Sequence, residues 1–143
     1  MPEDRIKLKI GGFERPLDDF RFHASRATGQ NSYPDGTLSF DTFDCTYIYD
    51  EEANGKLDVY AKFTDADHWI KGSVDFHRTK DKSGSPSASF QFGGAKITSY
   101  RETWGGSDDI KIEITISALN IKYQKGKPYK AGWSNVKDVK ETI

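Results

Sequence analysis

The sequence has a single cysteine, Cys45, and almost no net charge. One thiol cannot form an intramolecular disulfide, and no spacing of cysteine and histidine resembles a zinc site, so a small fold held by disulfides or zinc is excluded. The 21 Lys and Arg residues offset 22 Asp and Glu residues, which gives a formal charge of -1. We therefore expect neither nucleic acid nor an anionic membrane as a partner.

Long hydrophobic runs are absent as well. No segment approaches the roughly 20 apolar residues that cross a bilayer. The opening "MPEDRIKLKI" is charged early and lacks the apolar core of a signal peptide. From the sequence we expect no direct membrane insertion and no Sec-type export.

Residues that carry chemistry are few and scattered. His23, His68 and His77 lie far apart along the chain, and a solvated strand histidine explains each of them better than a catalyst does. Cys45 lies among aromatic residues of an expected strand, where a small buried side chain is the simpler interpretation. The sequence therefore predicts no catalytic residue.

Glycine pairs and acidic pairs do not complete a cofactor or metal site either. The Gly-Gly pairs at 11–12, 93–94 and 105–106 match neither GxGxxG nor a Walker loop, and we expect them to break strands where the chain bends. The acidic pairs at 65/67 and 108/109 lack the spacing of an EF-hand. We expect no cofactor and no metal.

Strand formers, in contrast, are abundant. The 143 residues include nine Phe, seven Tyr and three Trp, and this length suits one core rather than two, so we expect a single domain over residues 1–143. Stretches of alternating apolar and polar residues recur, separated by Gly, Pro, Ser and Asn. The expected fold is mainly β, a small antiparallel β-barrel or sandwich with one short flanking α-helix.

The first strands are expected to pair as a hairpin over residues 5–17, with its turn at the first Gly-Gly pair. The stretch "DFRFHAS" predicts a third strand, and residues 37–50 predict a fourth. The fourth strand changes register near Asp41 and Thr42, which indicates a bulge or a sharp bend.

One helix is expected after Asp50, because Ala53, Leu57, Tyr60 and Ala61 recur at helical spacing behind an acidic first turn. A hairpin turn at residues 54–55 is the alternative, since Asn-Gly weakens a helix there.

The longest alternation covers residues 109–123. Isoleucines at 110, 112, 114 and 116 alternate with Lys111, Glu113, Thr115 and Ser117, and the apolar positions then shift to 119, 121 and 123. One straight strand of this length would span about 50 Å, much more than the radius of gyration of such a domain, about 15 Å. We therefore expect a bend at residues 117–119. The polar face could meet water, a ligand, a neighbouring subunit or a channel.

Two segments lack this alternation. Residues 26–36, "RATGQNSYPDG", are expected to form a loop that is long for a connection between paired strands, and such loops are often functional. Residues 124–143 form a Lys-rich tail, in which Tyr129, Trp133, Val136 and Val139 could dock on the body or on a neighbouring chain.

The order of these segments resembles the hemolysin-coregulated protein family, the tube subunits (TssD) of type VI secretion systems, in a divergent branch. The stretches that carry the resemblance are "GTLSF", "DEEANGKLDVYAKF", "GSVDFHR", "FQFGGAKITSYRE" and "IKIEITISALNI". With the first hairpin they extend over residues 6–123. The loop departs from the family because it lacks a Gly-Arg-Pro run, and the tail is longer than expected.

The resemblance implies a structural protein of a contractile injection system, related to phage tail-tube subunits. Such subunits form hexameric rings that stack into a tube inside a contractile sheath. Contraction ejects the tube from the cytoplasm to the extracellular space or a target cell, together with spike and baseplate proteins and effectors. Under this hypothesis the ring-stacking interface is the long loop, with residues Thr28, Gly29, Gln30, Asn31, Ser32, Tyr33, Pro34, Asp35 and Gly36. The polar face of Lys111, Glu113, Thr115 and Ser117 would then contribute to the tube wall.

A monomeric small-molecule or carbohydrate-binding β-barrel is the alternative function. Trp69, Trp104 and Trp133 could line a sugar or lipid site in the mouth of a barrel. Most Phe and Tyr residues, however, fall on the inner side of their strands, as a packed core requires.

Overall fold

The computed structural model of the chain describes residues 6–11, 13–26, 38–39, 42–49, 59–65, 68–77, 86–106, 109–124, 128–131 and 139–143. Within these ranges most residues lie in strands, and the elements in chain order are β1 (Ile6–Ile10), β2 (Phe13–Pro16), β3 (Asp19–Phe22), β4 (Ser25–Arg26), β5 (Leu38–Ser39), β6 (Thr42–Ile48), α2 (Val59–Thr64), β7 (Ile70–Phe76), β8 (Ala88–Trp104), β9 (Ile110–Tyr123) and β10 (Tyr129–Lys130).

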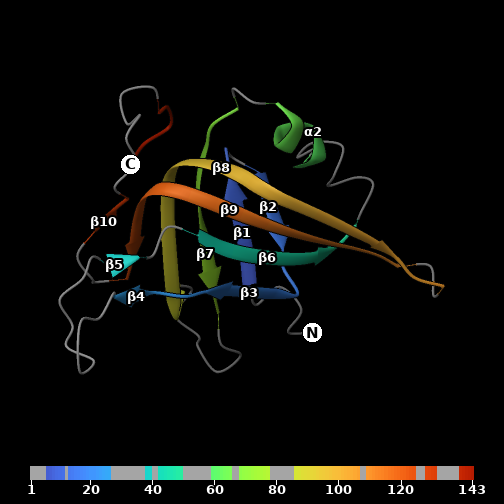
Figure 1. Ribbon diagram of the computed structural model, residues 1–143. Helices are drawn as coiled ribbons and strands as arrows, with labels where there is room; N and C mark the ends of the chain where they lie inside the picture. The colour runs from blue at the N-terminus through green and yellow to red at the C-terminus, as the bar shows by residue number, and fades with distance from the viewer. Residues whose placement is uncertain are drawn as a thin grey trace, which may run out of the picture.

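One antiparallel sheet curls around the core as a half-barrel (Figure 1). Its strands follow the order β2-β1-β7-β8-β9-β6-β3, and β10 pairs with β9 beside this path. β4 and β5 form a separate two-stranded sheet. α2 packs beside β8. The expected antiparallel β fold with a short flanking helix is confirmed. In the described ranges, no helix is long and apolar enough to cross a bilayer.

The first hairpin forms as the alternation predicts. β1 and β2 pair from Ile10 and Phe13 outward, and the turn between them begins at Gly11, whose φ of 56° favours glycine. The third expected strand is divided, because β3 joins the main sheet while β4 pairs with β5. Arg26, expected in the long loop, instead lies in β4 opposite Leu38, so the β4-β5 pair closes the base of the loop.

The isoleucine strand bends where its alternation shifts. Ile112, Ile114 and Ile116 of β9 are buried, and the next core positions are Ala118 and Ile121, three residues apart. Their partners on β8, Ala95 and Phe92, are also three apart. Both strands therefore change their inner face at the same point, and Figure 1 shows them bending together. The expected bend is confirmed.

The Gly93-Gly94 pair lies at this bend and does not end the strand. β8 continues through both glycines, and its pairing with β7 gains one extra residue between Phe92 and Ala95, as in a β-bulge. The expectation of a strand break is therefore wrong. The hydrogen bonds to β9 stay in register through the pair, so the strand bends without losing that neighbour.

The tail explains why glycine is needed there. Gly94 N–H donates to the Glu141 carbonyl oxygen at 2.7 Å. A methyl group on Gly93 would lie 2.8 Å from Ile143 Cγ2, and one on Gly94 would lie 2.7 Å from Val139 Cγ1. Leu119 is buried beneath this crossing. Tyr129 and Val139 thus dock on the body of their own chain, while Trp133 and Val136 lie outside the described residues.

The helix is present, but its inner face differs from the expected one. Val59 is 1% exposed and Phe63 packs on the core, whereas Tyr60 is 56% exposed and Ala61 is exposed as well. Val59 and Phe63 are four residues apart and share one side of the helix. The prediction that Tyr60 and Ala61 face inward is therefore wrong, and its other two positions, Ala53 and Leu57, lie outside the described residues.

Candidate functional site

The polar residues of β9 lie in the middle of a four-stranded polar surface. β9 is flanked by β6 and the outer half of β8, and β6 is flanked by β3. Alternating positions of these strands point away from the core, and the register aligns them in rows. Thr98 and Ser99 are both exposed because the pairing of β8 with β9 shifts between Ile97 and Ser99. We call this surface the polar face, and its residues are Asp19, Arg21, Asp44, Thr46, Thr98, Ser99, Arg101, Thr103, Lys111, Glu113, Thr115 and Ser117.

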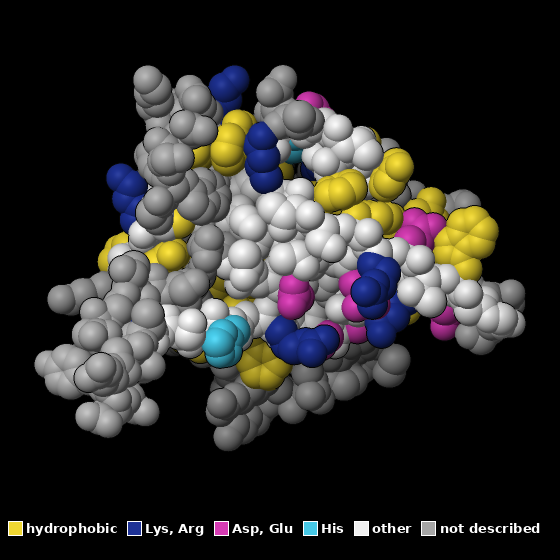
Figure 2. Space-filling model, viewed as in Figure 1, with side chains coloured by type: hydrophobic (Ala, Val, Ile, Leu, Met, Phe, Trp, Pro, Cys, Tyr) yellow, Lys and Arg dark blue, Asp and Glu magenta, His cyan; other side chains and the backbone are white. Residues whose placement is uncertain are grey.

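Charges of both signs alternate across the rows of the polar face. Arg21 is opposite Asp44, which is opposite Thr115, and the Thr115 hydroxyl donates to Asp44 Oδ1 at 2.7 Å. In the next row Glu113 is opposite Arg101. Figure 2 shows basic and acidic side chains intermixed on this surface. Because neighbouring charges have opposite signs, the face can lie against water or a like surface without strong repulsion.

The predicted wall residues are therefore brought together. Lys111 is exposed, and Glu113, Thr115 and Ser117 are half-buried. The Ser117 hydroxyl donates to Thr98 Oγ1 at 3.5 Å. The nine predicted stacking residues, 28–36, lie outside the described residues, so this part of the prediction stays untested.

Sequence reasoning missed the flanking residues of the polar face. Arg21 and Asp44 sit at outward positions of their own strands, a pattern the sequence displays, but nothing in it says that β6 lies beside β9. The Asp44–Thr115 contact joins positions 71 apart in sequence. Only the strand order reveals such a pairing.

The end of the β8-β9 hairpin is a second exposed surface. Trp104 is 77% exposed, and its indole N–H donates to Glu102 Oε2. The Tyr100 hydroxyl donates to Glu102 Oε1 at 2.7 Å. These two hydrogen bonds, that from Trp104 above all, hold the pKa of the Glu102 carboxyl below its ordinary value. Tyr60 extends the aromatic surface, with its ring 5.2 Å from that of Tyr100.

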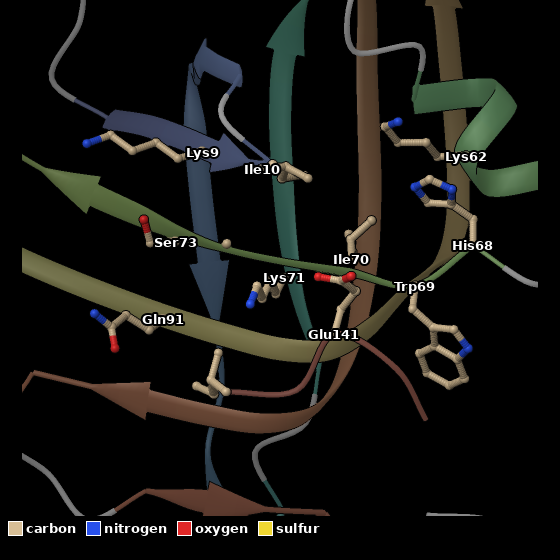
Figure 3. Close-up of a pocket in the computed structure, with 13 residues that line it drawn as sticks. Lys9, Ile10, Lys62, His68, Trp69, Ile70, Lys71, Ser73, Gln91 and Glu141 are labelled. Carbon is tan, nitrogen blue, oxygen red and sulfur yellow. The ribbon is translucent and has the colours of Figure 1, made fainter. Parts of the chain in front are cut away.

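A broad hollow lies on another side of the chain, between β1, α2, β7 and the tail (Figure 3). Its volume is about 750 Å³. We call it the lysine hollow, and it is lined by Lys9, Ile10, Gly11, Lys62, His68, Trp69, Ile70, Lys71, Gly72, Ser73, Gln91, Glu141 and Ile143. Figure 3 shows Lys62 and His68 on one side, Lys9 on the opposite side, and Lys71 with Glu141 between them.

A smaller cleft is almost entirely apolar. Its volume is about 240 Å³. We call it the aromatic cleft, and its lining is Ile6, Phe20, Phe22, Val74, Phe76, Ala88, Ser89, Phe90 and Tyr123. The rings of Phe22 and Phe90 are 5.1 Å apart, so the cleft continues the aromatic packing of the core.

The remaining candidate residues do not converge. His23 is exposed after β3, His77 follows β7, and His68 lines the lysine hollow. Cys45 is fully buried, as expected from the sequence; burial first, and the charge of Asp44 second, raise the pKa of its thiol. In the described ranges, no three His, Cys, Asp or Glu side chains are grouped so that they could hold a metal ion.

The tryptophans do not form a common site in the described residues. Trp69 precedes β7, and the Lys96 ammonium lies 4.4 Å from the center of its ring. The next residue, Ile70, pairs with Ala95 of β8. Trp104 lies nine positions beyond Ala95 on the same strand, so roughly 30 Å of extended strand separates it from Trp69. Trp133 lies outside the described residues.

Comparisons with known proteins place the fold. No protein-family model matches the chain, and no curated protein was found as a relative. Among solved structures, Hcp1 from Flavobacterium johnsoniae matches with a TM-score of 0.75 at 16% identity, over 88% of this chain and 98% of that one.

Two further structures match over similar lengths. A type VI secretion system effector from Yersinia pestis has a TM-score of 0.65 at 15% identity, over 88% of this chain and 99% of that one. A chain of the sheath-tube complex of an extracellular contractile injection system, PVC, has a TM-score of 0.60 at 12% identity, over 87% and 90%. The chain thus has the fold shared by Hcp proteins and this injection-system complex, as the resemblance in its sequence implied.

Proposed function

We propose that this chain is a structural subunit of the inner tube of a type VI secretion system or a related contractile injector. The observation that carries the proposal is the Hcp-like fold over nearly the whole of both chains. The sequence stretches that resemble tube subunits support the same assignment.

The subunit is proposed to form hexameric rings that stack into a tube. The two ends of the four-stranded polar surface, β3 and the outer half of β8, have no further strand beside them in the described ranges. Open strand edges favour pairing with another chain, and a closed ring limits that pairing. The near-zero net charge also suits close packing of identical copies.

The polar face is proposed to contribute to the tube wall, with Lys111, Glu113, Thr115 and Ser117 at its center. The opposite side of β9 is core, so this surface is what the strand offers to an aqueous lumen or a neighbour. Its mixed charges keep it wettable without attracting one sign of cargo.

The export route and partners follow as part of the same proposal. The tube is assembled in the cytoplasm inside a contractile sheath and is ejected with spike proteins and effectors. In this role the chain needs no enzymatic activity. His23→Ala and Cys45→Ala variants are therefore expected to leave secretion unchanged.

Light scattering after size exclusion, followed by negative-stain microscopy, tests the proposal directly. Rings of six copies are expected, and a strict monomer at high protein concentration would contradict the tube assignment and favour the ligand-binding alternative.

The predicted stacking loop has its own test. Deleting residues 30–35 is expected to abolish stacking of rings while the domain stays folded, because the β4-β5 pair closes the base of the loop outside the deletion. A deletion variant that still forms tubes would refute the role of the loop. Circular dichroism of the variant checks that the domain is folded.

A further inference from the structure

The hairpin end, residues 100–106, is an exposed unit whose shape is already fixed. One side of the hairpin carries Tyr100, Glu102 and Trp104. This side continues the core side of the sheet, because Tyr100 pairs with Ile114, Glu102 pairs with Ile112, and both isoleucines are core residues. At the end of the hairpin no core residues cover this side, and Trp104 is 77% exposed. Its hydrogen bond to Glu102 restricts the indole, so binding it costs little side-chain entropy.

An exposed, restricted tryptophan beside a carboxylate is typical of an interface anchor. Tryptophan is enriched among the residues that contribute most to binding between proteins, above all where it fills a pocket. On the core side of the hairpin end, Glu102 supplies a negative charge, whereas Arg101 and Lys111 point to the polar face. A matching receptor must therefore offer apolar contact together with cations.

The lysine hollow offers both. Ile143, which is 56% exposed, and the half-buried Trp69 supply apolar surface. Three lysines come from three different elements. Lys9 is engaged by Asp75, with 3.3 Å between Nζ and Oδ2. Lys62 and Lys71 make no ion pair with the described residues. Glu141 is the carboxylate in the lining, so lysines predominate there.

The aromatic cleft fits the hairpin end less well. Its lining has no charged side chain. Seating Trp104 there would bring the Glu102 carboxylate against apolar surface without a cation, and burying an unpaired charge is costly. The lysine hollow avoids this cost because Lys62 and Lys71 can pair with the carboxylate.

The contact must join two copies. Figure 1 shows the hairpin pointing away from the body, so its end does not fold back onto its own chain. Each copy carries one hairpin end and one hollow. Such a head-to-tail contact repeats from copy to copy and closes into a ring or continues as a stack.

We propose that the hairpin end of one copy docks in the lysine hollow of the next copy, with Trp104 against Ile143 and Trp69, and Glu102 against Lys62 and Lys71. This contact rests on the proposed tube function and names the surfaces that join the subunits.

A cross-linking experiment on the full chain tests the contact. Gly106→Cys places a thiol on the hairpin end at a site with no neighbouring atom within 4 Å, and Gln91→Cys places one in the hollow. Mixing the two variants under mild oxidation is expected to give a disulfide-linked dimer that neither gives alone. Ala88→Cys in the aromatic cleft is the matched control and should not cross-link to Gly106→Cys. The native Cys45 does not compete, because it is fully buried.

Charge reversal provides the second test. Glu102→Lys and Lys71→Glu are each expected to weaken association about tenfold or more, and the double variant should recover most of the loss. Asp18→Lys, at an exposed position between β2 and β3 that lines neither the hollow nor the aromatic cleft, is the control and should associate like the wild type. Sedimentation velocity measures the association.

The outcomes separate this contact from the proposed function. A wild type that forms rings, with Glu102→Lys and Trp104→Ala forming them equally well, overturns the contact and leaves the tube function standing. Cross-linking to the aromatic cleft in place of the hollow also overturns it. A wild type that stays monomeric contradicts both.

Discussion

The pKa of Glu102 depends on the hydrogen bonds that its carboxylate accepts at the hairpin end. Hydrogen bonds from Trp104 first, and from Tyr100 second, lower the pKa of its carboxyl. Because the folded-state pKa is lowered, the ionised carboxylate stabilises the folded chain at pH values above the ordinary carboxyl pKa. This stabilisation is lost as the pH falls through the lowered pKa. The carboxylate is largely exposed, so the gain in stability is small.

Trp104→Phe should therefore raise the pKa of Glu102 toward its ordinary value, because phenylalanine keeps the ring but has no N–H to donate. Nuclear magnetic resonance titration of the carboxyl carbons measures the shift. Tyr60→Phe is the matched control, since Tyr60 contacts the Tyr100 ring and not the carboxylate. An unchanged Glu102 pKa in Trp104→Phe would show that the indole hydrogen bond does not form in solution.

Cys45 is the second residue with a testable titration. Burial raises the pKa of its thiol, so above the ordinary thiol pKa of about 8.5 the unfolded chain ionises while the folded chain does not. The free energy of unfolding should fall as the pH rises through this range, by up to about 1.4 kcal/mol per pH unit from this group. Cys45→Ala removes that contribution.

Urea unfolding of the wild type and Cys45→Ala between pH 7 and pH 10 isolates the effect of the thiol. The stability difference between the two chains should shift steadily against the wild type as the pH rises. Equal pH slopes would mean that the thiol ionises as readily in the folded chain as in the unfolded one.

At the scale of elements, the tail crosses β8 at its bend, next to Gly93 and Gly94. Alanine substitution at four glycines separates two causes of destabilisation, backbone strain at a positive φ and close contacts of the added methyl group. Gly11 has a positive φ of 56° but no atom near its added methyl group, and Gly93 has close contacts but no positive φ. Gly94 combines a φ of 57° with contacts to Val139, and Gly106 has neither feature.

Alanine substitutions should follow that division. We expect losses of about 1–2 kcal/mol for Gly11→Ala from backbone strain, and about 1–3 kcal/mol for Gly93→Ala from overpacking. Gly94→Ala should lose the most and Gly106→Ala almost nothing. Urea unfolding measures each change.

Removing residues 139–143 from the Gly93→Ala chain gives the decisive comparison. The tail contributes the atoms that the new methyl group meets, so without the tail the substitution should cost little. A cost that persists in the shortened chain would show that the tail does not cross β8 in solution.

At the scale of the whole molecule, the proposed place of the polar face on the tube wall is tested by the access of reagents to it. Lys111 is exposed in the single chain, so Lys111→Cys should react with a small maleimide and with a bulky polyethylene-glycol maleimide. In assembled tubes the small reagent should still react, whereas the bulky one should be excluded from the lumen. Lys122→Cys is an exposed comparison site on the same strand. Unchanged reactivity of Lys111→Cys with the bulky reagent after assembly would contradict its place on the wall.

The sequence by itself determined which side of β9 is core. Ile112, Ile114 and Ile116 are buried because alternation along a strand is a local property that burial of one face preserves. The same local logic located the first hairpin and the bend of β9. The family resemblance anticipated the fold that the solved structures share.

Only the tertiary structure decided which distant segments meet. Arg21, Asp44 and Thr115 form one row because β3, β6 and β9 are adjacent, and strand order depends on long-range packing that no local pattern contains. The Gly93-Gly94 pair was mistaken for a strand break because the tail that crosses it lies more than 40 residues further along the chain. The prediction that Tyr60 faces inward was wrong because helical spacing shows which residues share a face but not which face packs on the sheet. In the structure Val59 and Phe63 pack on the core.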